Sequence, residues 1–163
     1  MNKKILLFVV LVLWSALIFS FSSQRAEDSA SLSRDLAKKV ITTIEKVFGI
    51  EVDNSADDED GKAGRFFGLM EHYLRKTAHF FLFMVLGIIS SALAGEYSGQ
   101  YTNALAVALL YCLFYAASDE IHQLCVPGRA GMLRDVALDF CGSAVGSIVY
   151  IKTRKHLFWK EMI

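Results

Sequence analysis

The stretch ILLFVVLVLWSALIFSF, residues 5–21, holds no charged residue in 17 positions and decides the class of fold. Three more apolar runs follow it at residues 77–95, 101–118 and 140–151, and the only ionisable group in the first of these three is the His79 imidazole. With helical flanks, each run can reach or nearly reach the roughly 20 residues that cross a hydrocarbon core. A composition that is 54% hydrophobic agrees with four membrane crossings.

These crossings are expected to be α-helices, because backbone groups without hydrogen-bond partners are very costly in lipid. The single proline, Pro127, falls between two predicted spans, where it breaks no helix. We therefore predict an all-α, polytopic membrane protein, a four-transmembrane-helix bundle that forms one domain over residues 1–163. The predicted spans are about 5–21, 76–95, 101–118 and 136–151.

An outer segment, residues 22–75, joins the first two spans. Within it, Leu32, Leu36, Val40, Ile44 and Val47 recur at helical spacing, so we predict an extracytoplasmic amphipathic helix over about 31–48. Such a helix is expected to lie on the membrane surface or to pack on the bundle. The acidic stretch DNSADDED, residues 53–60, predicts a disordered linker.

Basic residues flank the first and last spans, which predicts that both termini are cytoplasmic. They are Lys3, Lys4, Lys152, Arg154, Lys155 and Lys160. The first span is interpreted as an uncleaved anchor; the alternative is a signal peptide, since Ser20 and Ser22 stand near a possible cleavage point. A net charge of zero gives no indication of a nucleic-acid partner, and three cysteines without CxxC spacing are interpreted as structural thiols.

In this orientation, polar residues at the start of the second span, the end of the third and the start of the fourth all face outside. His72, Arg75, Lys76 and His79 share one side of a helix, as do Tyr111, Tyr115, Asp119 and His122. On the fourth span, Asp135 and Asp139 stand above Gly142 and Gly146, whose GxxxG spacing favours close packing of a neighbouring helix. Both aspartates should therefore turn into the bundle, and Tyr111 and Tyr115 are expected to be core or interface aromatics.

The polar residues at this membrane face form the predicted ligand-binding site. Its members are Arg75, Lys76, His79, Asp119, Glu120, His122, Gln123, Arg129, Asp135 and Asp139. Arginine forks suit a phosphate, and carboxylates can orient them. The same residue types can hold a divalent metal, with Asp119, His122 and Asp139 as its candidate ligands, although the pattern requires no cofactor. Ion pairs that only fix the helix ends are the structural alternative.

Three segments together resemble the VanZ-like family. They are Ser22-Ser23-Gln24, RKTAHFFLFMVLG at residues 75–87 and SDEIHQLCVPGRAGMLRDVALDFCGSAVG at residues 118–146. The resemblance covers essentially the whole chain and implies a four-span protein of the bacterial cytoplasmic membrane. Its functional positions would be Arg75, Lys76, His79, Asp119, Glu120, His122, Gln123, Arg129, Asp135, Asp139 and Gly142. Phe83 departs from the pattern, where a tyrosine is expected.

The family's name-giving member is associated with teicoplanin resistance, so the resemblance implies a role in the cell envelope and in glycopeptide antibiotic resistance. The site is then expected to bind membrane lipids or lipid-linked envelope precursors. One alternative is a metal-dependent hydrolase or transferase acting on such intermediates, with Asp119, Glu120 and His122 as catalytic candidates. No G-x-S-x-G motif accompanies them, which favours a binding protein. A transporter subunit is a further alternative, although the charges cluster at one face and not at the midplane.

Overall fold

The computed structural model describes residues 2–23, 39, 42–43, 46–47, 62–98, 100–126 and 131–161. Four long helices make up this part of the chain: α1 (Lys3–Ser22), α3 (Lys62–Ser98), α4 (Tyr101–Leu124) and α5 (Leu133–Glu161). Each contains a stretch long and apolar enough to cross a membrane, namely Lys3–Ser22, His72–Ser98, Tyr101–Gln123 and Leu133–Lys155. The prediction of an all-α protein with four membrane-spanning helices is therefore confirmed.

The helices are longer than the predicted spans. Residues 62–75, which we placed in the outer segment, are helical, and α5 continues past residue 151 to Glu161. Apolar residues report only the part of a helix that lies in lipid, and the polar flanks here contain no proline that would end it. The predicted linker at 53–60 and most of the amphipathic helix at 31–48 lie outside the described residues, so both stay predictions.

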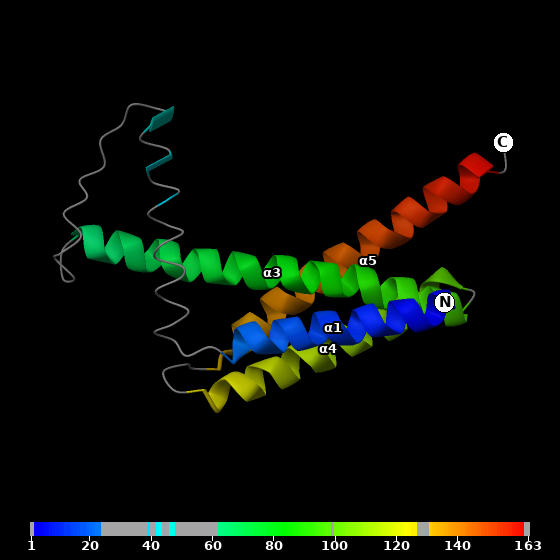
Figure 1. Ribbon diagram of the computed structural model, residues 1–163, viewed down its shortest axis with the longest axis horizontal. Coiled ribbons are helices and arrows are strands. Elements are labelled where there is room, and N and C mark those ends of the chain that lie inside the picture. Colours follow the sequence, from blue (N-terminus) through cyan, green and yellow to red (C-terminus); the bar gives the residue numbers. More distant parts are fainter. Residues whose placement is uncertain are drawn as a thin grey trace.

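Successive helices run in opposite directions, so the start of α1 and the end of α5 lie at the same end of the bundle (Figure 1). At this end, Lys3 Nζ lies 2.5 Å from Glu96 Oε1 of α3, and Lys4 lies 4.5 Å above the Tyr97 ring. Lys155 of α5 lies 5.6 Å from the centre of the Tyr101 ring of α4. We call this the basic end; the opposite end collects the residues of the predicted site.

The backbones of α3 and α5 touch where the two helices cross (Figure 1). A Cβ atom on Gly142 or Gly146 would clash with the carbonyl oxygen of Phe80 or Met84, respectively, and one on Gly87 would clash with that of Ser143. Small residues allow helix backbones to approach in this way. The GxxxG stripe thus faces a neighbouring helix, as predicted, and it carries Asp139 into the interior.

Helix α1 packs mainly against α3, with Leu11 and Ile18 in the buried core and several polar side chains that bond to α3 and α4. The Trp14 indole donates a hydrogen bond to the carbonyl of Leu82, and the Tyr115 hydroxyl donates one to the carbonyl of Ser15. The Ser15 and Tyr111 hydroxyls lie 2.9 Å apart. Tyr111 and Tyr115 also pack against the buried core, so their interpretation as core or interface aromatics is confirmed.

Candidate functional site

All four described helices contribute to one group of polar side chains at the end opposite the basic end. We call this group the polar layer. It consists of Ser22 on α1, Lys76 and His79 on α3, Asp119, Glu120 and Gln123 on α4, and Asp135 and Asp139 on α5. It lies next to the ends of the uncharged runs at residues 5–21, 77–95, 101–118 and 140–151.

Asp119 is the most firmly held member of the polar layer. Its side chain is buried, with 2% of the residue exposed. Its Oδ2 accepts hydrogen bonds from the Ser22 hydroxyl at 2.7 Å and from the Gln123 amide at 3.0 Å. Its other oxygen, Oδ1, has no hydrogen-bond partner among the residues that the structure describes. Two donors therefore fix the carboxylate while one oxygen stays available.

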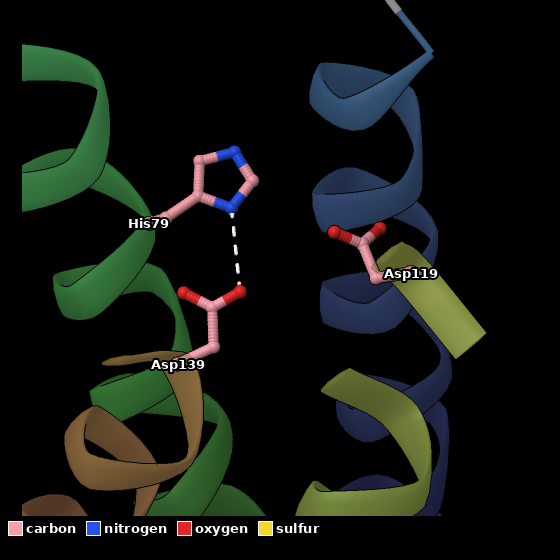
Figure 2. A group of neighbouring side chains, drawn as sticks. All are labelled: His79, Asp119 and Asp139. Atoms are coloured by element: carbon pink, nitrogen blue, oxygen red, sulfur yellow. Dashed lines mark ion pairs between the residues drawn. The ribbon is translucent and has the colours of Figure 1, made fainter. Parts of the chain in front are cut away.

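Asp139 lies across the layer from Asp119 and is equally buried, with 2% exposed. Its Oδ2 lies 3.7 Å from Nδ1 of His79, and its Oδ1 has no hydrogen-bond partner within the described parts of the chain. The Asp119 carboxylate points toward this pair (Figure 2). One ligand atom each of His79, Asp119 and Asp139 lie within 4.8 Å of one another. These three side chains form the centre of the polar layer.

Lys76 and Asp135 form an ion pair that joins α3 to the first turn of α5. Both side chains are about a quarter exposed, so this pair marks the outer edge of the layer. Arg75 is half-buried beside it in sequence, and Arg134 is exposed. Arg129, another predicted member of the site, lies outside the described residues. Lys76 is thus the cation that the structure places at the edge of the layer, with Arg75 next to it in the sequence.

Glu120 contacts the chain just before α5 with one of its two carboxylate oxygens. It is buried, and its Oε1 accepts a hydrogen bond from the backbone amide of Met132, just before α5 begins. The side chain therefore links the end of α4 to the start of α5. This contact gives Glu120 a structural part, while its Oε2 has no hydrogen-bond partner among the described residues.

Replacing Glu120 by alanine should release this link. A hydrogen bond to a charged group contributes about 1.5–3 kcal/mol, so exchange of the Met132 amide should become at least about tenfold faster. Hydrogen–deuterium exchange of a peptide covering residues 126–136 measures this. Glu120→Gln keeps a carbonyl acceptor and should stay close to wild type; equal exchange in Glu120→Ala and wild type would contradict the assignment.

His122 does not join the centre of the layer, although it was predicted as a metal ligand. Its ring stacks on Phe19 of α1 with 4.2 Å between centroids, and its Nε2 lies 3.0 Å from the Ser23 hydroxyl. It lies almost one turn beyond Asp119 on α4, where its ring contacts the end of α1 instead of α3 and α5. His79 lies beside the two aspartates instead, and the predicted metal set with His122 stays a prediction.

Ser22 is a member of the layer that the residue types did not reveal. A serine at the end of an apolar helix carries no charge and matches no ligand pattern. Its position in Ser22-Ser23-Gln24 was the only signal, because that segment was part of the family resemblance. The structure shows that it positions Asp119 through a hydrogen bond.

The centre and the edge of the polar layer offer different chemistry. Its centre offers two carboxylate oxygens and an imidazole nitrogen, which together suit a cation. Its edge offers lysine and arginine side chains, which suit a phosphate or carboxylate.

A family model described as VanZ/LLP1 matches residues 7–158, nearly the whole chain. No curated protein and no solved structure matches this chain.

Proposed function

From the chain's membership of the VanZ-like family and from its polar layer, we propose a membrane protein that binds a phosphate-bearing headgroup, of a lipid or a lipid-linked cell-envelope precursor. The observation that carries the proposal is the position of the polar layer. Charged side chains from three helices, with Ser22 from the fourth, collect where the apolar spans end. A lipid phosphate lies at that depth when its acyl chains lie along the spans.

The edge of the layer supplies the chemistry for an anion. Lys76 is a compact point charge, and Arg75 carries a planar fork that matches the oxygens of a phosphate. Asp135 pairs with Lys76 and so limits the side-chain conformations that the lysine adopts. Because Arg75 and Lys76 are adjacent on α3, a bound phosphate would lie between the starts of α3's span and α5.

The proposal includes an orientation. Lys3, Lys4 and Lys155 gather at the basic end, and cytoplasmic loops carry the excess of lysine and arginine. We place that end, with both termini, in the cytoplasm of a bacterial cell and the polar layer at the outer face of its cytoplasmic membrane. There the ligand would be an envelope precursor at the depth where glycopeptides reach their target. Sequestering that precursor would then reduce teicoplanin binding.

Arg75→Ala tests the proposal. Native mass spectrometry of protein extracted in mild detergent should show anionic lipid or lipid-linked precursor bound to wild type and reduced at least about tenfold in the variant, since charge-assisted hydrogen bonds to phosphate are among the strongest. Arg154→Ala, on α5 near the basic end, removes the same charge far from the layer and should retain the lipid. Equal retention in both variants would contradict the proposal.

The same two variants test the link to antibiotics. Expressed in a teicoplanin-sensitive bacterium, wild type and Arg154→Ala should raise the inhibitory concentration of teicoplanin, and Arg75→Ala should not. Lipid binding without any change in that concentration would restrict the proposal to headgroup binding and remove the role in resistance.

A second candidate function, hydrolysis or group transfer on a lipid-linked intermediate, is favoured by one observation. The buried carboxylates of Asp119 and Asp139 each keep an oxygen without a hydrogen-bond partner among the described residues, beside a histidine. Such groups can activate water or a hydroxyl. Release of phosphate from a lipid diphosphate by wild type, abolished in Asp119→Asn, would establish catalysis; the absence of any product would leave the binding function.

A further inference from the structure

We infer that His79, Asp119 and Asp139 bind one divalent first-row metal ion, Zn²⁺ or Mn²⁺, at the centre of the polar layer. The three side chains come from three different helices, α3, α4 and α5, so the ion would tie these helices together at this end. The inference deepens the proposed function, because a cation here lies beside the edge where a phosphate would bind. The role of the ion rests on the proposed function, but the binding of the ion does not.

The geometry supports coordination. Metal–ligand bonds to histidine nitrogen and carboxylate oxygen are about 2.0–2.2 Å, so two ligand atoms of one ion lie at most about 4.4 Å apart. One ligand atom from each residue lies within 4.8 Å of the other two. Because three such atoms evenly spaced around one ion lie at most about 3.8 Å from one another, side-chain movements of about 1 Å bring all three into range. Figure 2 shows that Asp119 points toward the space beside His79 and Asp139.

The hydrogen bonds around Asp119 provide an independent observation. Ser22 and Gln123 both donate to Oδ2, and Oδ1 has no partner among the described residues although the side chain is buried. At Asp139 the oxygen without a hydrogen bond is again Oδ1, but Oδ2 faces His79, itself a proposed ligand, so in the described part of the chain only Asp119 has outer partners. Outer partners of this kind orient a metal-ligating carboxylate and leave its other oxygen for the ion.

Electrostatics points in the same direction. Two buried carboxylates repel each other, and burying a charge is unfavourable unless a partner offsets it. Among the described residues, the Asp119 carboxylate is supported only by two neutral donors, Ser22 and Gln123. A divalent ion offsets both charges and is bound by a neutral imidazole.

The ligand types select the metal. Ca²⁺ and Mg²⁺ prefer sites made only of oxygen, whereas Zn²⁺ and Mn²⁺ accept a histidine nitrogen together with carboxylates. Three protein ligands leave at least one coordination position open. A phosphate oxygen or a water molecule would fill that position from the edge of the layer.

The test measures metal in the full-length protein, purified in mild detergent without a histidine tag. Elemental analysis should give about one equivalent of zinc or manganese per wild-type chain, and after chelation Zn²⁺ should rebind. His79→Ala and Asp139→Asn should lose the ion, with at least about 100-fold weaker Zn²⁺ binding, and Ser22→Ala should weaken binding about 10–100-fold as an outer-partner variant. Co²⁺ added to the wild-type apoprotein should give visible bands that are lost in His79→Ala at the same Co²⁺ concentration.

Two histidine variants serve as matched controls. His72 lies on the same helix but is exposed, and His122 stacks on Phe19, so His72→Ala and His122→Ala should keep the ion. Loss of metal in His122→Ala with retention in His79→Ala would overturn the inference, as would wild type that binds no Zn²⁺ or Mn²⁺ at micromolar concentration. Arg75→Ala separates the two proposals: metal retained with lipid lost supports both, and lipid bound by metal-free wild type supports headgroup binding alone.

Discussion

Gly146→Ala is expected to lower the free energy of unfolding by about 3 kcal/mol, the upper part of the usual range for overpacking. A side chain at this position would clash with the Met84 carbonyl of α3, which is backbone and has no rotamer with which to move away. The two helices must then separate along their whole contact, including the hydrogen bond from the Ser147 hydroxyl to the Gly87 carbonyl. Unfolding in mixed detergent micelles of increasing SDS content measures the change.

Gly95→Ala is the matched control, and its effect should have the opposite sign. Gly95 lies in α3, and a Cβ atom there would meet nothing within 4 Å. Alanine is favoured over glycine in a helix interior by about 1 kcal/mol, so this variant should be as stable as wild type or more so. Equal destabilisation of the two variants would contradict the backbone contact between α3 and α5.

Phe83→Ala should lower the free energy of unfolding by about 2 to 3 kcal/mol. Phe83 is fully buried among α1, α3 and α4, with its ring centroid 6.0 Å from that of Tyr115. Removing the ring leaves a cavity and abolishes its contacts. The cost is expected to stay below the roughly 3 to 5 kcal/mol typical of soluble proteins, because lipid solvates a phenyl ring about as well as the protein core does.

Phe81 provides the control two residues away on the same helix. Its side chain is 53% exposed on a face that would contact lipid, so Phe81→Ala should change the stability by less than about 0.5 kcal/mol. The same SDS titration compares both variants. A smaller effect at Phe83 than at Phe81 would show that the buried face of α3 has been assigned to the wrong side.

Much of the fold follows from the sequence, because lipid imposes simple requirements on a chain. Four apolar runs predict four helices, and Gly142 and Gly146 predict the face of α5 that packs closely. The helix ends were harder to predict. Residues 62–71 precede the candidate span that begins at His72, yet they are helical because no proline interrupts them. Hydropathy indicates which residues lie in lipid, but it does not indicate where the backbone hydrogen bonds of a helix end.

The composition of the site was predictable in part. Helical spacing correctly brought His79, Asp119 and Asp139 to one end of the bundle. It could not decide between His79 and His122, since a helical wheel shows which residues share a side but not how each helix is rotated against its neighbours. Nor could it show that Glu120 accepts from the Met132 amide, a contact that depends on the path of the chain into α5.

The buried stripe of α5 also has a consequence for how the protein is made. Asp139, Gly142, Ser143, Gly146 and Ser147 give this helix a face that interacts poorly with acyl chains. Because α3 and α4 are synthesised first, their small and polar surface is already present when α5 leaves the translocation machinery. The last helix can therefore enter the bilayer against protein instead of lipid, so that its insertion and its tertiary packing occur as one step.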